Sequence, residues 1–256
     1  MDTIERSANF IDADDLVARA AALKPVLRER QRDTERARRV SDETVADLKA
    51  AELYKVLQPA RYGGYEQDLW TFTRCAAEIG AGCGSTGWVY ATAAQHQWQI
   101  GMFDDAAQAE VWGDTPEGIS ASSYSPGGTA VETDGGYRIT GKWLYCSGVL
   151  NADWMILGAR LAKDENSDPY GQGYVLVPKS DYRVEDNWDV MGLVGTGTMA
   201  GFTEVLRERG VPMPEVQARI AMLSELVGGS LLAMGLLMRP ACLLLIGTMV
   251  VAGAVG

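Results

Sequence analysis

The sequence GISASSYSPGGTAVETDGGYRITGKWLYCSG, Gly118 to Gly148, indicates the class of fold most clearly. Short runs rich in Val, Ile, Thr and aromatic residues alternate in it with Gly, Pro and Asp, as in β-strands separated by turns. The Asp134-Gly135 pair is the signal of a tight hairpin. Two more runs of this kind follow, ADWMILGARL (152–161) and GYVLVPKSDYRVED (173–186). Strands at this spacing predict a compact antiparallel β domain over residues 118–198.

The residues before this stretch have the periodicity of helices and form a predicted N-terminal helical domain, residues 1–117. In the first helix Leu16, Ala20, Leu23 and Leu27 share one stripe, and the acids before them suit the first turn of a helix. Ser41 is the predicted N-cap of a second helix, DETVADLKAAELYKVL, residues 42–57. Three more helices are expected over residues 70–82, from about residue 85, and over 104–113.

The pattern changes again after Thr198, where a hydrophobic helical segment, residues 199–256, is predicted. Two apolar runs, 226–237 and 241–255, flank Arg239-Pro240, and each is shorter than the ~20 residues that span a bilayer. One continuous span would bury Arg239 at a cost of about 2.5–3.5 kcal/mol, which two packed helices with a turn there avoid. Membrane contact through residues 222–256 and a pair of buried helices in a soluble bundle both fit this pattern.

Composition and charge narrow the classes of function. The net charge of -11 argues against a nucleic-acid partner, and the one basic cluster, RERQRDTERARR (28–39), is interleaved with acids as on a solvated helix face. One His and four Cys with no C-x-x-C pair predict no metal site. Because the N-terminus has no signal-peptide pattern, we expect a cytoplasmic protein with reduced cysteines.

Few side chains are suited to catalysis. His96 is the only side chain whose unperturbed pKa lies near neutrality, and it is compatible with a catalytic role or with a structural one. The loop Ser120–Thr129 offers hydroxyls and backbone N–H groups for an anion or a polar ring, although Ser and Gly also simply make turns. Cys146 could be a nucleophile, but it has no base nearby in the sequence and we interpret it as a packing residue.

Four motifs occur in one order: PARYGG (59–64), STGWV (85–89), the stretch 122–159, and DNWDVMGLVGTGT (186–198). Together they resemble the acyl-CoA dehydrogenase-like flavoproteins. Within these, the chain is most similar to the two-component flavin-dependent aromatic monooxygenases, such as the p-hydroxyphenylacetate and secosteroid phenol hydroxylase oxygenase components. The resemblance covers residues 15–198. It implies an α+β fold, with a helical domain followed by the β domain.

The resemblance also implies the reaction. The oxygenase component takes reduced flavin, FMNH2 or FADH2, from a separate flavin reductase. With O2 as co-substrate it hydroxylates a phenolic small molecule through a flavin C4a-hydroperoxide. Ser147 would lie near flavin N5, His96 would hold or deprotonate the phenol, and Ser122 would also face the substrate. The residues that match the flavin contacts of the family are Trp88, Ser122, Ser123, Tyr124, Tyr145, Cys146 and Ser147.

Beyond residue 198 the resemblance changes. The family continues with a strand and a four-helix domain, which completes the flavin site and builds the homo-oligomer, and residues 199–256 do not match this domain. They resemble DoxX-type membrane proteins instead, in ELVGG, GLL and an Arg before an apolar run. We therefore expect a junction of two truncated coding regions, at which truncation impairs activity. An acyl-CoA dehydrogenase-type flavoprotein and a non-catalytic membrane-associated remnant are the alternatives.

Overall fold

A computed structural model describes residues 11–186, 188 and 190–198 of the chain. The chain divides into two compact units, Met1–Met199 and Ala200–Gly256, and the described residues all belong to the first. The predictions of an apolar helical tail and of membrane contact through residues 222–256 lie outside the described residues. Within residues 11–186, 188 and 190–198, no helix is long and apolar enough to cross a membrane.

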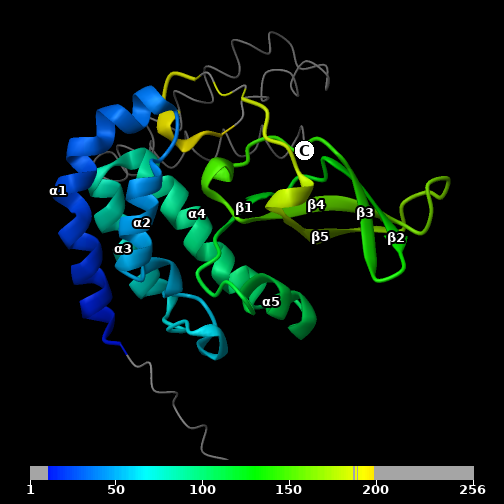
Figure 1. Ribbon diagram of the computed structural model, residues 1–256, viewed down its shortest axis with the longest axis horizontal. Helices are drawn as coiled ribbons and strands as arrows, with labels where there is room; N and C mark the ends of the chain where they lie inside the picture. The colour runs from blue at the N-terminus through cyan, green and yellow to red at the C-terminus, as the bar shows by residue number, and fades with distance from the viewer. Residues whose placement is uncertain (1–10, 187, 189, 199–256) are drawn as a thin grey trace, which may run out of the picture. The chain divides into compact units, whose positions relative to one another are not determined.

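The first half of the described region is helical, as the periodicity predicts (Figure 1). Asp12 and Ser41 cap the first two helices, each with its side chain accepting a hydrogen bond from a backbone N–H of the first turn. The predicted cap at Ser41 is therefore confirmed. The α-helices are α1 (Ala13–Ala37), α2 (Asp42–Ala50), α3 (Leu69–Gly82), α4 (Gly84–Ile100) and α5 (Asp105–Trp112).

The helix predicted over residues 42–57 ends early, at Ala50. Glu52 has a left-handed backbone with φ of 60°, which stops the α-helix before a 3-10 turn at Leu53–Lys55. The Glu52 carboxylate accepts hydrogen bonds from Tyr65 Oη at 2.6 Å and Arg19 Nη1 at 2.7 Å. These bonds, the one from Tyr65 foremost, lower the pKa of Glu52 to about 2. The early end of α2 thus places one carboxylate where it links α1 to the loop before α3.

The second half forms one five-stranded sheet that is mixed, not antiparallel as the sequence predicted. Two short strands lie parallel to the long strand β4, and one lies antiparallel to it. The parallel pairs arise because the chain makes a hairpin and a loop between β1 and β4 before it returns in the same direction. The strands are β1 (Ser120–Ser123), β2 (Gly128–Thr133), β3 (Gly136–Gly141), β4 (Trp154–Ala162) and β5 (Gly171–Pro178).

The predicted hairpin at Asp134-Gly135 is confirmed. β2 and β3 pair antiparallel from Gly128↔Gly141 to Thr133↔Gly136, and Asp134 and Gly135 form the turn between them. Gly135 has φ of +83°, a left-handed backbone that Gly adopts without steric cost.

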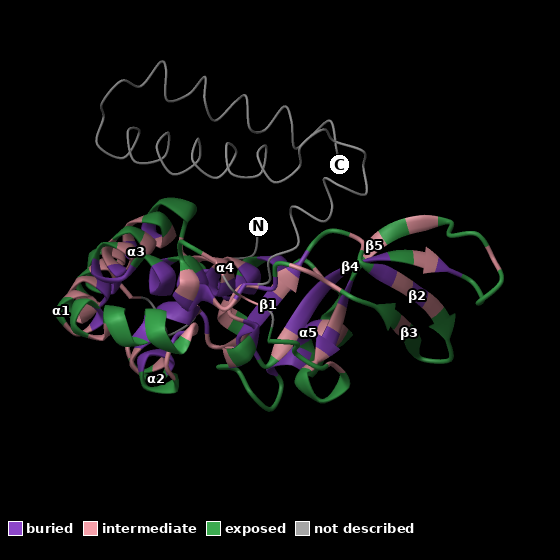
Figure 2. Ribbon diagram, turned by 90° about the horizontal axis from the view of Figure 1, so that it is seen from above, coloured by how far each residue is buried: buried purple, intermediate pink, exposed green. Residues whose placement is uncertain are grey.

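Helix α4 packs against α3 on one side and against β1 on the other. Most of its residues are buried, as Figure 2 shows. Gly87, within the STGWV motif, permits the close packing of the two helices, because a Cβ there would lie 2.5 Å from the Cα of Gly80. The helix is thus shared between the helical half and the sheet, and positions residues of both.

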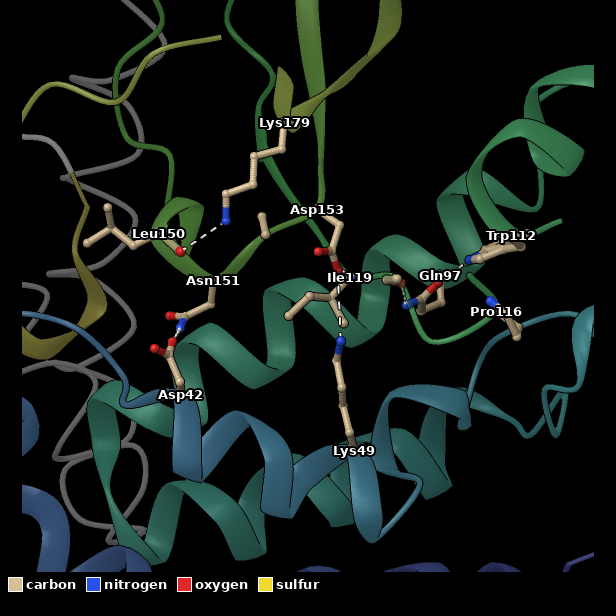
Figure 3. Close-up of polar contacts among 12 residues, drawn as sticks. Asp42, Lys49, Gln97, Trp112, Pro116, Ile119, Leu150, Asn151, Asp153 and Lys179 are labelled. Atoms are coloured by element: carbon tan, nitrogen blue, oxygen red, sulfur yellow. Dashed lines mark hydrogen bonds and ion pairs between the residues drawn. The ribbon is translucent and has the colours of Figure 1, made fainter. Parts of the chain in front are cut away.

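Polar contacts join the helices to the start of the sheet (Figure 3). Gln97 of α4 donates through Nε2 to the carbonyl of Gly118 at 3.0 Å, and its Oε1 accepts from Trp112 Nε1 at 3.0 Å. Asp153 Oδ2 accepts from the backbone N–H of Ile119 at 3.0 Å. Because Gln97 and Trp112 are each only 1% exposed, both bonds lie where water cannot replace them.

The Gln97→Leu variant should lose about 2–4 kcal/mol of unfolding free energy, since it leaves a buried indole N–H and a buried carbonyl without partners. Urea unfolding of the full chain measures this loss. Gln172→Leu, at an exposed position of β5, is the matched control and should change the unfolding free energy by less than about 0.5 kcal/mol. Equal stability of the two variants would contradict the role given to Gln97.

Candidate functional site

A hollow of about 260 Å³ opens where α4, β1 and the loop 143–148 meet. Every residue that the sequence predicts as a flavin contact lines this hollow, with the exception of Cys146. The structure thus brings together side chains that are up to 59 positions apart in the chain. The lining residues are Trp88, Thr92, Ser122, Ser123, Tyr124, Ser125, Leu144, Tyr145 and Ser147.

The loop 143–148 is held in place by its own backbone and by β1. Ser123 is buried and donates through Oγ to the carbonyl of Leu144 at 2.6 Å. Tyr145 and Gly148 both have left-handed backbones, with φ of 62° and 73°. Gly is required at position 148, because a Cβ would come within 2.8 Å of a Val89 side-chain carbon. These constraints bring the loop against α4 and direct Ser147 toward Trp88.

Ser147 belongs to a chain of side-chain hydrogen bonds. Trp88 Nε1 donates to Ser147 Oγ at 2.9 Å, and Ser147 Oγ lies 2.6 Å from Thr198 Oγ1. Thr198 Oγ1 donates to Thr196 Oγ1 at 2.9 Å, which in turn donates to the carbonyl of Leu193 at 2.8 Å. The short 3-10 turn Val194–Thr196 packs against α1 and α4, and Thr196 and Thr198 lie behind Ser147, outside the lining of the hollow.

His96 is 1% exposed and does not line the hollow. Its Nδ1 lies 2.8 Å from the carbonyl oxygen of Ser120, an atom that can only accept. Nδ1 therefore carries the proton, and Nε2 of the neutral ring has the free lone pair. Burial lowers the pKa of His96 to about 4, so the ring is neutral at pH 7.

Tyr124 lies next to both His96 and the hollow. Its ring contacts the His96 ring edge-on, with 6.2 Å between centroids, and it also lines the hollow. Its hydroxyl donates to Gln99 Oε1 at 2.7 Å, and its ring packs edge-on against Tyr174 at 5.5 Å. Tyr124 is therefore a predicted flavin contact that lines the hollow and also contacts His96.

Sequence reasoning did not identify Thr198, Gln99 or Tyr174. Thr198 is the last residue of the motif DNWDVMGLVGTGT, so the resemblance includes it. The neighbouring residues do not indicate that its hydroxyl contacts Ser147. Gln99 follows His96 by three residues on α4, a spacing that places both on one helix face. Tyr174 shows no signal beyond the alternation of its strand.

Cys146 lines a different hollow of about 260 Å³, between β3, β4 and the segment 181–185. It is 5% exposed, and burial raises the pKa of its thiol to about 11, so the thiol is protonated at neutral pH. Its predicted role as a flavin contact stays a prediction. Cys75, Cys83 and Cys146 are all buried and free. No group of three or more His, Cys, Asp or Glu side chains in the described part of the chain could hold a metal ion.

Two family profiles match the chain. The acyl-CoA dehydrogenase N-terminal domain matches residues 15–113, and DoxX matches residues 190–256. Both resemblances that the motifs indicate are thus found again by comparison with whole families. Most of the DoxX match lies outside the described residues.

The chain is similar to the flavin-dependent monooxygenase oxygenase subunit HsaA of Rhodococcus jostii, with 38% identity over 80% of this chain and 52% of that protein. It is 38% identical to the FADH2-dependent resorcinol hydroxylase oxygenase component of a Rhizobium species, over 71% of this chain and 44% of the relative. The crystal structure of the HsaA monooxygenase from M. tuberculosis superposes with a TM-score of 0.70 at 38% identity, over 73% of this chain and 49% of that one. The chain spans about half the length of the curated relatives that it matches.

The burial of His96 predicts a pH dependence of stability. Its pKa is lower in the folded chain, about 4, than the ordinary value of 6.5, so the unfolded chain binds the proton first as pH falls. Between pH 7 and pH 4 this residue alone should remove about 3 kcal/mol of unfolding free energy. His96→Asn, whose amide N–H can still donate to Ser120, should lack that part of the pH dependence.

Urea unfolding of both proteins at several pH values measures this difference. His96 is the only histidine in the chain, so carboxylates give the two proteins the same remaining pH dependence. Parallel curves for the variant and the unmodified chain would show that His96 is not buried as a neutral ring.

Proposed function

The described part of the chain is homologous to flavin-dependent monooxygenase oxygenase subunits of the acyl-CoA dehydrogenase-like family, and on this basis we propose that the chain is the oxygenase component of a two-component phenol hydroxylase. The observation that carries the proposal is the hollow around Ser147, where the residues matching the flavin contacts of the family converge from three elements.

The residues around the hollow fit the ring system of a flavin. An isoalloxazine is flat and apolar on its faces and polar along one edge. Trp88, Tyr124 and Tyr145 are 51%, 41% and 40% exposed, so aromatic side chains border the hollow where a flat ring could lie. The hydroxyls of Ser122 and Ser147 suit the polar edge. Ligand pockets usually measure about 300–1,000 Å³, so this smaller hollow would hold the ring system and not a whole nucleotide.

The flavin would be FADH2, as the name of the Rhizobium relative suggests, and a separate reductase would deliver it. Bound reduced flavin supplies the electrons and the activation of O2. The protein supplies placement: Ser147 would bind the polar edge of the ring, and Trp88 and Thr198 would hold Ser147.

His96 would take the proton of the phenol. A phenolate attacks an electrophilic oxygen more readily than a phenol does, so a base near the hydroxyl favours the reaction. Neutral His96 has its lone pair on Nε2, and the Ser120 carbonyl fixes that tautomer. Tyr124 contacts His96 and lines the hollow, so it would be the wall shared by flavin and phenol. Ser122, beside Tyr124, would face the substrate as well.

An acyl-CoA dehydrogenase-type flavoprotein is the second candidate, since the N-terminal domain match carries that name. Such an enzyme would be reduced by an acyl-CoA without a reductase. Addition of an acyl-CoA to the flavin-loaded chain therefore separates the two functions. The phenol hydroxylase predicts no change of the flavin absorbance, whereas the dehydrogenase predicts loss of the oxidised flavin band.

The full chain should bind FADH2 in the hollow. Anaerobic titration, followed by quenching of tryptophan fluorescence, should saturate, and Ser147→Ala should weaken binding roughly three- to tenfold because one hydrogen bond is lost. Trp70→Phe is the control: Trp70 is 68% exposed on α3 and does not line the hollow, so its replacement should leave the affinity unchanged. No saturable binding by the unmodified chain would overturn the proposed function.

The His96→Asn variant should lose phenol hydroxylation and keep flavin binding. With resorcinol, O2 and a reductase that supplies FADH2, turnover should fall about 10²- to 10⁴-fold, the usual worth of general acid–base catalysis. The affinity for FADH2 should stay within about twofold, because His96 does not line the hollow. Product is measured by chromatography. Full activity of the variant, or none of the unmodified chain despite bound FADH2, would contradict the proposal.

A further inference from the structure

We propose that Thr198 and Thr196 are positioning residues that fix the direction of the Ser147 hydroxyl, so that Ser147 presents a lone pair, and not its proton, to the hollow. This inference rests on the proposed function, because the ligand it concerns is the flavin. It makes Ser147 an acceptor that discriminates reduced from oxidised flavin.

The direction of the Ser147 hydroxyl follows from assigning one proton to each hydroxyl in this series of hydrogen bonds. Each hydroxyl has one proton to donate. The proton of Thr196 goes to the carbonyl of Leu193, which can only accept. The contact between Thr196 and Thr198 must then use the proton of Thr198. The 2.6 Å contact between Thr198 and Ser147 is therefore left with the proton of Ser147.

The indole of Trp88 completes the assignment. An indole N–H can only donate, so Trp88 Nε1 occupies one lone pair of Ser147 Oγ, at 2.9 Å. With its proton committed to Thr198, Ser147 keeps its second lone pair for a ligand in the hollow. Any other orientation of the Ser147 proton would leave the Thr198–Ser147 contact without a hydrogen.

Burial makes this arrangement persistent. Thr196 and Thr198 are 3% and 8% exposed, so water has little access to compete for their hydroxyls. The backbone N–H of Gly148 donates to the carbonyl of Thr196 at 3.0 Å, which fastens the serine loop to the threonine segment. Gly195 lies tightly between Thr34 and Ser85, where a Cβ would come within 2.6 Å of a Thr34 methyl.

A fixed acceptor distinguishes the two redox states of the ligand. Reduced flavin carries a hydrogen on N5 and can donate there, whereas oxidised flavin has a lone pair at N5 and can only accept. A lone pair on Ser147 accepts a hydrogen bond from the N5–H of reduced flavin. It repels the N5 lone pair of oxidised flavin. Ser147 oriented in this way should bind reduced flavin in preference to oxidised flavin, and hold the N5 hydrogen in place.

The test compares affinities for oxidised FAD and anaerobically reduced FAD in the full chain. Thr198→Val removes the acceptor for the Ser147 proton, which can then rotate toward oxidised N5. The ratio of the dissociation constants, oxidised over reduced, should fall about three- to tenfold from this loss of one hydrogen-bond preference. Thr198→Ser keeps the hydroxyl and should keep the ratio. Binding is measured by fluorescence, so the readout needs no turnover.

Thr196→Val is the second variant, because it leaves the Thr198 proton without its acceptor and should lower the ratio in the same direction. Circular dichroism and the unfolding midpoint establish that each variant is folded. An unchanged ratio in both folded valine variants, with FADH2 still bound, would overturn this inference and leave the proposed function intact. Failure of the unmodified chain to bind FADH2 would overturn both.

Discussion

Two hydrogen bonds from adjacent residues of α4 hold the sheet against the helices, and the candidate site depends on them. Gln97 donates to the carbonyl of Gly118, and His96 donates to that of Ser120. Both side chains are 1% exposed, so these bonds cannot be exchanged for bonds to water at low cost. Because β1 begins at Ser120, the two bonds fix the position of β1 along the axis of α4. In that position Ser122 and Ser123 line the same hollow as Trp88.

The same constraint gives His96 a structural bond and is compatible with the catalytic role that we propose for it. Ser120 satisfies Nδ1, selects the tautomer and leaves the lone pair on Nε2, while burial keeps the ring neutral. A structural histidine and a catalytic base are usually alternatives for a lone His. Here the bond to Ser120 leaves Nε2 as the ring nitrogen that has the lone pair, and the proposed function uses that lone pair. Tyr124 contacts the His96 ring and also lines the hollow.

The sequence predicted what depends on neighbours in the chain, and missed what depends on distant ones. The cap at Ser41 and the Asp134-Gly135 turn are set within a few residues, and both are found. The parallel pairing of β1 with β4 joins Ser120 to Trp154, and no periodicity reports such a pairing, so the sheet was expected to be antiparallel. The flavin contacts came from resemblance to a family. The contact between Thr198 and Ser147 could not be predicted from the sequence, because only the fold brings the two residues together.

The proposed function requires that the hollow beside Ser147 hold the polar edge of a reduced flavin. A crystal structure of the full chain, grown anaerobically with FADH2, would show whether it does. We expect the flavin ring among Trp88, Tyr124 and Tyr145, with N5 within about 3 Å of Ser147 Oγ, the length of an N–H···O hydrogen bond. A flavin ring bound elsewhere on the chain, or one whose N5 points away from Ser147, would contradict it.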